Sequence, residues 1–137
     1  MSAHAREALG PILHELRPLL AMHWREIAHF QDIELDPDYD RYLAMEAAGV
    51  LRVYTMRHAG ELVGYGIFAV CPSLHYRKSV QAIQDVLFVK PSHRGAGGLF
   101  IDWCDMQLAA DGVQVVYQHV KRTLDFGPAL MRLNYEP

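Results

Sequence analysis

The most informative stretch of this sequence is Asp85-Val86-Leu87-Phe88-Val89-Lys90-Pro91-Ser92-His93-Arg94-Gly95-Ala96-Gly97-Gly98-Leu99-Phe100-Ile101. An apolar strand runs into a loop with three glycines in four positions, and a helix begins directly after it. Glycines let backbone amides approach a ligand closely, and the free amides in the first turn of a helix favour an anion. Arg94 adds a charged donor for a phosphate oxygen. The stretch predicts a phosphate-binding unit, with a tight strand-to-helix turn that binds nothing as the alternative.

Upstream of this stretch, the spacing of apolar residues predicts two helices. Apolar positions recur at helical spacing from Pro11 to Ile27, and Pro18 inside this run is expected to kink or divide the helix. A second, short helix is expected to begin at Asp36-Pro37, because an aspartate can cap free amides and proline suits the first helical position. Gly49 is expected to end it.

The remaining elements predict a sheet covered by helices. Two strand-like runs joined by a glycine-containing loop are typical of an antiparallel hairpin. A strand–helix–strand unit then follows, which implies a mixed sheet. We therefore predict an α+β fold with a mixed, mostly antiparallel sheet, formed as one domain over residues 1–137. The expected elements are strands 50–56, 62–70, 82–89 and 113–120, and helices 99–110 and 125–133.

Composition and spacing exclude several classes of protein. The chain has 13 Lys and Arg against 16 Asp and Glu, and its basic residues are scattered, which argues against a nucleic-acid partner. No run approaches the ~18 apolar residues of a membrane span, and the early charges at Arg6 and Glu7 are unlike an export signal. The eight histidines show no metal-ligand spacing. We expect a cytoplasmic protein without a metal site.

The motif Val89-x-Pro91-x-x-Arg94-Gly95-x-Gly97, together with the order of elements, resembles the acetyl-CoA-binding motif of the GNAT N-acetyltransferase superfamily. The usual form of that motif is Arg/Gln-x-x-Gly-x-Gly/Ala. Arg94 and Gly97 match it, whereas Leu99 stands where Gly or Ala is expected. Residues 129–135 resemble the last helix of the family and its closing segment. A looser likeness links residues 23–27 to GNAT-like proteins of bacteriophages and prophages.

This resemblance implies acetyl-CoA as cofactor and a small-molecule or protein amine as acceptor. The pantetheine arm would lie where strand 82–89 separates from strand 113–120, and the pyrophosphate would lie on the glycine-rich loop. The amine would enter over the two N-terminal helices. The cofactor-binding residues that the resemblance implies are Leu87, Phe88, Val89, Arg94, Gly95, Ala96, Gly97, Gly98 and Leu99.

For the chemistry, the family often uses a carboxylate on the strand before the motif as general base. Asp85 is the only acid on that strand, and a solvated aspartate at a strand edge is the alternative. Strand alternation places Asp85 on the same face as Leu87 and Val89 unless a bulge turns it. Leu130 stands where the family has a tyrosine as general acid. The departure of the CoA thiolate is then unassisted, or another group such as Tyr117 or Tyr135 helps, or turnover is slow.

Two further segments are candidates for acceptor binding. Acidic residues occupy every second position from Asp32 to Asp40. We expect Asp32 and Glu34 among them to attract a cationic amine, and the alternative is that the segment is solvated and only caps the following helix. Tyr76, in the loop before strand 82–89, is the third substrate-binding candidate. GNAT domains usually continue with two more strands after the last helix, and these strands are absent from this sequence. Either a second subunit supplies them, as in a homodimer, or the sequence is truncated, or the acceptor site is unusually open. The alternative function is a catalytically weak CoA-binding or protein-interaction module.

Overall fold

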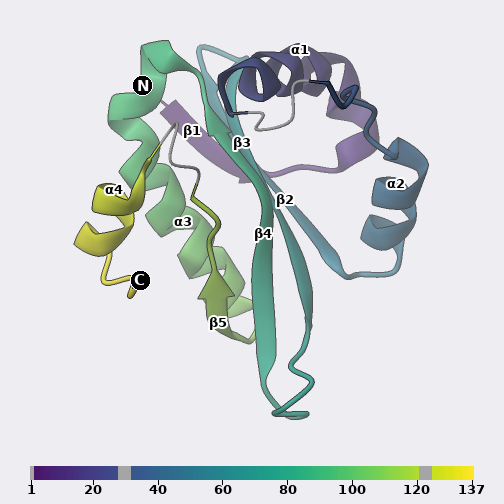
Figure 1. Cartoon of the computed structure of the whole chain (residues 1–137), viewed down its shortest axis with the longest axis vertical. Helices are drawn as coiled ribbons and strands as arrows, with labels where there is room; N and C mark the ends of the chain where they lie inside the picture. The colour runs from purple at the N-terminus through teal and green to yellow at the C-terminus, as the bar shows by residue number, and fades with distance from the viewer. Residues whose placement is uncertain (1, 28–31, 121–124) are drawn as a thin grey trace.

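Five strands form one sheet within residues 2–27, 32–120 and 125–137, which are the residues that the computed structural model describes. Their order in the sheet follows the chain, β1-β2-β3-β4-β5 (Figure 1). The first three pairs of neighbours are antiparallel, and β4 and β5 are parallel. The predicted α+β fold with a mixed, mostly antiparallel sheet is confirmed. The strands are β1 Ser2–Arg6, β2 Leu51–His58, β3 Glu61–Pro72, β4 Val80–Val89 and β5 Val113–Tyr117.

Helices cover both faces of this sheet (Figure 1). Helices α1 (Leu9–Ile27) and α2 (Tyr39–Ala47) lie on one face, and α3 (Gly97–Ala110) and α4 (Gly127–Arg132) lie on the other. A short 3-10 helix, η1 (Pro91–Ala96), joins β4 to α3. No strand follows α4 within the described residues 125–137.

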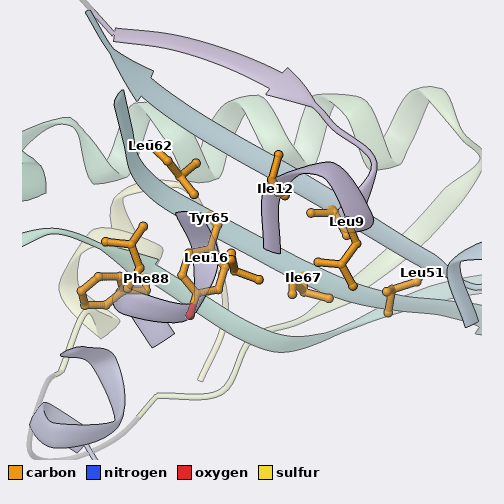
Figure 2. Close-up of a cluster of buried hydrophobic side chains, with 10 residues drawn as sticks. Leu9, Ile12, Leu16, Leu51, Leu62, Tyr65, Ile67 and Phe88 are labelled. Carbon is orange, nitrogen blue, oxygen red and sulfur yellow. The ribbon is translucent and has the colours of Figure 1, made fainter. Parts of the chain in front are cut away.

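Each face has its own apolar core, because the strands alternate their side chains between the two faces. On the α1 face, leucines and isoleucines spaced by three or four residues pack on the sheet (Figure 2). On the α3 face, Phe100, Cys104 and Leu108 pack on Tyr54 and Phe68. The α1-face cluster consists of Leu9, Ile12, Leu16, Leu19, Leu51, Val53, Leu62, Tyr65, Ile67 and Phe88.

The structure corrects the predicted elements at several points. Strand β1 was not expected, since Ser2–Arg6 is short and lacks an apolar pattern; its backbone pairing with β2 makes it a strand. Pro18 lies inside α1 and does not divide it. Asp38, rather than Asp36, caps α2, accepting a hydrogen bond of 3.0 Å from the backbone amide of Arg41. Strand β5 ends at Tyr117, three residues earlier than predicted, because its pairing with β4 ends there.

None of the helices in the described ranges combines the length and the apolar character that a bilayer crossing requires.

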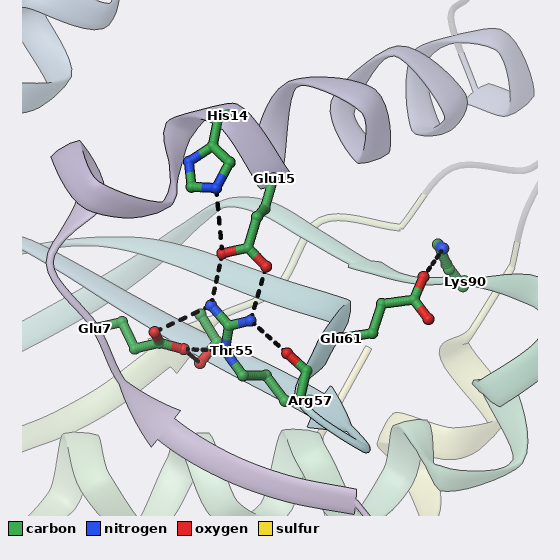
Figure 3. Close-up of polar contacts among 8 residues, drawn as sticks. Glu7, His14, Glu15, Thr55, Arg57, Glu61 and Lys90 are labelled. Carbon is green, nitrogen blue, oxygen red and sulfur yellow. Dashed lines mark hydrogen bonds and ion pairs between the residues drawn. The ribbon is translucent and has the colours of Figure 1, made fainter.

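A charged network fastens α1 to the sheet (Figure 3). Arg57 of β2 donates hydrogen bonds to Glu7, which follows β1, at 3.0 and 3.2 Å, and to Glu15 of α1 at 2.8 and 2.9 Å. Thr55 donates a further hydrogen bond to Glu7. The hydrogen bonds from Arg57 are the main reason that the pKa values of the Glu7 and Glu15 carboxyls lie below their ordinary value. One guanidinium thus holds the segment after β1 and helix α1 to β2, which follows them by more than 40 residues in the sequence.

Replacing Arg57 by methionine should lower the free energy of unfolding at pH 7 by about 1–2 kcal/mol, because two partly exposed carboxylates lose their charged partner. Depressed carboxyl pKa values contribute stability above the unfolded value of 4.5, and this contribution is lost as the pH falls through the folded values. The difference between wild type and variant should therefore shrink below about pH 4.5. Urea unfolding at several pH values measures it. Lys90→Met, which breaks the exposed Lys90–Glu61 pair, is the control and should leave the free energy of unfolding unchanged. If Arg57→Met is as stable as wild type, the charged network does not stabilise the fold.

Candidate functional site

The two parallel strands at the edge of the sheet separate part of the way along β4. Their ladder pairs Val80–Ile83 with Val113–Tyr117 and goes no further. Beyond it, the side-chain oxygen of Gln84 accepts a hydrogen bond of 2.6 Å from the backbone amide of His119. This contact is the last one between the two chain segments before they separate, and we call the point of separation the fork. In the described part of the chain, the remainder of β4 has no strand partner on that side. The opening that the resemblance implies is present.

The unpaired edge of β4 offers backbone hydrogen-bonding groups. The amide of Lys90 donates a hydrogen bond of 2.8 Å to the carbonyl of Val63 on β3. In an antiparallel pair, successive residues direct their backbone groups alternately toward the partner strand and away from it, so every second residue counted back from Val89 faces away from β3. Leu87 and Val89 are in that position. The Val89 carbonyl accepts a hydrogen bond of 3.0 Å from Nε of Arg94, which agrees with this direction. The amide and carbonyl of Leu87 and the amide of Val89 therefore face the opening.

A cavity of about 200 Å³ lies in this opening. It brings together most of the predicted cofactor-binding residues, whereas Gly95, Ala96 and Leu99 do not line it, and the Leu99 side chain is 70% exposed. The start of α4 also contributes, which the sequence did not indicate. The lining residues are Leu87, Phe88, Val89, Arg94, Gly97, Gly98, Ile101, Asp125, Phe126 and Ala129.

The glycines of the loop are not required by the fold itself. Gly97 has helical dihedral angles, φ −62° and ψ −40°, that any residue adopts. A Cβ atom added at Gly95, Gly97 or Gly98 would meet no atom within 4 Å. Glycine in a helix costs about 0.5–1 kcal/mol relative to alanine. What these glycines preserve is free space around the backbone at the start of α3.

Arg94 is held at the rim of the same cavity. Besides the Val89 carbonyl, its guanidinium binds the carboxylate of Glu26, in the last turn of α1, at 2.6 Å. The guanidinium carbon lies 5.8 Å from the centre of the Phe88 ring. The arginine that the motif assigns to phosphate thus already has an anionic partner within the protein.

Asp85 lies at a β-bulge. The pairing of β3 with β4 passes from Ile67–Val86 to Phe68–Gln84, which leaves Asp85 as the extra residue. The bulge places Asp85 on the α2 face, where the Tyr42 hydroxyl of α2 donates a hydrogen bond to its carboxylate. Simple alternation would have placed it on the α3 face, with the neighbours of Leu87.

A second cavity of about 410 Å³ surrounds this carboxylate, between α2 and the sheet. It is on the face opposite the α3 core, and Asp85 is next to Gln84, which closes the fork. Arg41 and Tyr42 contribute to it, and sequence reasoning missed both. The only available signal was their placement beside Met45 on one amphipathic helix. The lining residues are Pro37, Asp38, Arg41, Tyr42, Met45, Leu51, Ala69 and Asp85.

The other predicted site residues do not join these two cavities. Asp32 and Glu34 are exposed in the connection before α2. Tyr76 is 73% exposed and lies in the loop between β3 and β4, whereas Arg94 follows the other end of β4. Among the described residues, no group of three or more His, Cys, Asp or Glu side chains is placed to hold a metal ion.

The tyrosines considered as general acid are also placed elsewhere. Leu130, at the position where the resemblance expects a tyrosine, is buried. The Tyr135 hydroxyl donates a hydrogen bond of 2.7 Å to Asp105 of α3, and burial raises the pKa of that hydroxyl. The side chain of Tyr117, on β5, is 51% exposed. Neither tyrosine lines the two cavities.

No family model and no curated protein matches this sequence, whereas solved structures match the fold. A ribosomal-protein-alanine N-acetyltransferase from Brucella melitensis biovar Abortus 2308 has a TM-score of 0.75 at 20% identity, over 99% of this chain and 92% of that one. The aminoglycoside acetyltransferase meta-AAC0020 from an uncultured soil metagenomic sample has a TM-score of 0.76 at 15% identity, over 99% and 90%. A predicted acetyltransferase with acetyl-CoA from Clostridium acetobutylicum has a TM-score of 0.71 at 12% identity, over 100% and 91%.

These neighbours are GNAT N-acetyltransferases, and the chain has the GNAT fold, as its motif and order of elements predict.

A buried histidine lies behind Phe88, which lines the cavity beside Arg94. His23 of α1 is 7% exposed and stacks on Phe88, with ring centroids 4.9 Å apart. Burial is the largest effect on the imidazole and lowers its pKa to about 4; the nearby Glu26 raises it and Arg94 lowers it. His23 is therefore neutral near pH 7.

The His23 imidazole should titrate near pH 4 in an NMR experiment. Because the unfolded histidine binds its proton near pH 6.5, the unfolded state holds more protons between pH 4 and 6.5, and stability should rise with pH across that window, by up to about 3 kcal/mol. His23→Gln should remove this rise, and His14→Gln, at an exposed histidine, should keep it. An NMR midpoint above pH 6 for His23 would contradict the burial argument.

Proposed function

We propose that this chain is an acetyl-CoA-dependent N-acetyltransferase that acts on a primary amine. The observation that carries the proposal is the set of glycines beside Arg94, which neither backbone conformation nor internal packing requires. They lie at the mouth of an opening whose edge offers unpaired backbone groups. The fold supports the reaction class, since solved structures of similar fold are described as acetyltransferases, one of them with acetyl-CoA.

In this proposal, β4 and the loop after it hold the cofactor. The amides at the start of α3 and the Arg94 guanidinium bind the pyrophosphate, with Arg94 exchanging Glu26 for phosphate oxygens. The backbone groups of Leu87 and Val89 pair with the amides of the pantetheine arm. Val89 and Asp85 are four residues apart, about 13 Å along a strand, so an extended arm that starts at the loop ends near the fork. When bound, acetyl-CoA supplies the thioester carbonyl that the amine attacks.

Asp85 is proposed as the general base. An aliphatic ammonium must lose a proton before its nitrogen can attack, and the Asp85 carboxylate lines the α2-side cavity beside the fork. Tyr42 holds this carboxylate by donating a hydrogen bond to it. The proton passes from the ammonium to Asp85, directly or through a water molecule, while the arrangement of the two cavities orients amine and thioester toward each other.

A second candidate is a module that binds CoA without turnover. Leu130 favours it, because a buried hydrocarbon cannot protonate a departing thiolate. Under either candidate, the roles of Asp32, Glu34 and Tyr76, a homodimer, a cytoplasmic location and a phage-type origin stay predictions.

Replacing Gly97 or Gly98 by alanine should change stability and cofactor affinity in opposite directions. The free energy of unfolding should rise by about 0.5–1 kcal/mol, since alanine suits a helix better and meets no atom in the protein. Affinity for acetyl-CoA should fall by about tenfold or more, the scale of a lost charged hydrogen bond, because the methyl group holds phosphate away from the amides. Thermal unfolding and calorimetry measure the two effects.

Gly10→Ala is the matched control for these variants. Gly10 lies in the first turn of α1, and an added Cβ would be at an ordinary 3.8 Å from Leu43. This variant should gain stability without losing affinity. If Gly97→Ala and Gly98→Ala both bind acetyl-CoA as tightly as wild type, the loop is not the phosphate site.

Asp85→Asn should lower kcat by ~10²–10⁴, the usual contribution of a general base, and leave acetyl-CoA affinity unchanged. The loss should lessen at high pH, where more of the acceptor is already neutral. Steady-state rates across pH with a primary amine, together with cofactor calorimetry, measure both effects. Asp40→Asn, at an exposed position in the first turn of α2, is the control. Normal turnover by Asp85→Asn would move the search for the base elsewhere.

A further inference from the structure

The cavity between α2 and β4 carries charges of both signs. Asp85 and Asp38 contribute carboxylates to its wall, and Arg41 contributes a guanidinium. The rest of the wall is largely apolar, formed by Pro37, Met45, Leu51 and Ala69. A ligand that matches this wall needs a cationic group, an anionic group and a hydrocarbon part.

The Arg41 guanidinium is available to an anion. Its residue is exposed, and within residues 2–27, 32–120 and 125–137 no carboxylate forms an ion pair with the side chain. Asp38, three residues earlier, accepts a hydrogen bond from the backbone amide of Arg41 as the cap of α2. By contrast, Arg52, Arg57 and Arg94 each have a carboxylate partner. Arg41 thus differs from these arginines in lining a cavity without a partner.

The surroundings favour a carboxylate over a phosphate as that anion. A guanidinium matches a carboxylate in a planar, two-bond geometry. Asp38 and Asp40 lie in the same turn of α2 as Arg41, and their negative charges oppose a doubly charged phosphate more than a singly charged carboxylate. No second arginine or lysine lines the cavity to offset that repulsion.

The size of the cavity suits a small-molecule acceptor. Its volume of about 410 Å³ is at the lower end of the range for small-molecule sites. The apolar wall provides contact for one hydrocarbon side chain. A protein N-terminus has an amine but no carboxylate next to it, and so leaves Arg41 without an anion.

We infer that the acceptor is a small zwitterion, an amino acid or dipeptide with a free carboxylate and an apolar side chain. Its ammonium lies at Asp85, its carboxylate binds Arg41, and its side chain contacts Met45 and Leu51. This inference rests on the proposed function and names its substrate class. Arg41 is then a residue that determines specificity, and Asp85 keeps the role of base.

The test compares each acid with its amide, which keeps the amine and the size but lacks the carboxylate charge. The pairs are leucine with leucinamide, and alanyl-leucine with alanyl-leucinamide. Wild type should prefer at least one acid over its amide in kcat/KM. Arg41→Gln should lower kcat/KM for that acid by about 10- to 100-fold, the scale of a charged hydrogen bond, and leave it unchanged for the amide. Comparing both enzymes with both compounds cancels any difference in amine basicity.

Arg77→Gln is the charge-matched control, because Arg77 is exposed in the hairpin loop far along β4 and should not alter the preference. Acetylation of acid and amide with equal efficiency, a preference for the amides, or an equal loss for both in Arg41→Gln would overturn the inference and leave acetyl transfer standing. A preference for the amides would point to peptide N-termini instead.

Calorimetry with CoA-saturated protein separates this inference from the proposed reaction. Suppose that no amine is acetylated, but that the wild-type protein binds an acid and not its amide, and that Arg41→Gln no longer binds the acid. This result would support the zwitterion site and contradict acetyl transfer. If neither acid nor amide binds and none is acetylated, the zwitterion site is refuted.

Discussion

The separation of β4 from β5 is the constraint on which the cavity beside Arg94 depends. A strand that stayed paired along its whole length would have no free backbone edge, and its neighbour would fill the opening. Here the parallel ladder ends at Ile83–Tyr117, and the Gln84–His119 hydrogen bond closes the fork. The bulge at Asp85 follows at once and turns that carboxylate to the opposite face. One strand therefore presents backbone to one cavity and a carboxylate to the other, a few residues apart.

The sequence predicted those elements whose residues repeat at a clear period. Helix α1 was expected to within a few residues because its leucines and isoleucines recur at helical spacing, and the β2–β3 hairpin because a short glycine-containing loop joins two apolar runs. Strand β1 has no such period. Its Ser2–Arg6 segment becomes a strand because β2 offers an edge to pair with, and that is a property of the folded sheet rather than of the segment.

The site divides in the same way. Arg94 and its glycines are contiguous in sequence, so their motif was recognisable, and the structure places most of these residues around one cavity. The face on which Asp85 lies depends on a bulge, which adds a residue without any mark in the sequence. The contributions of Glu26, Arg41 and Phe126 come from helices distant along the chain, and only the packing of those helices brings them to β4. Single-sequence reasoning has no access to such contacts.

The Arg94–Glu26 pair gives the cavity beside β4 an internal competitor for any anion that binds there. Any anion that engages Arg94 competes with Glu26, so part of its binding energy is spent on breaking a contact of 2.6 Å. That contact fastens the last turn of α1 to the end of β4. Once it is broken, Glu26 is a free carboxylate on the face where amines are expected to enter. An anion bound at Arg94 then changes the charge that an incoming cation meets, and reciprocity requires that a cation held by Glu26 make Arg94 more available to an anion. Under the proposed function, this ion pair thus provides a basis for coupling between the binding of an anion and the binding of a cation.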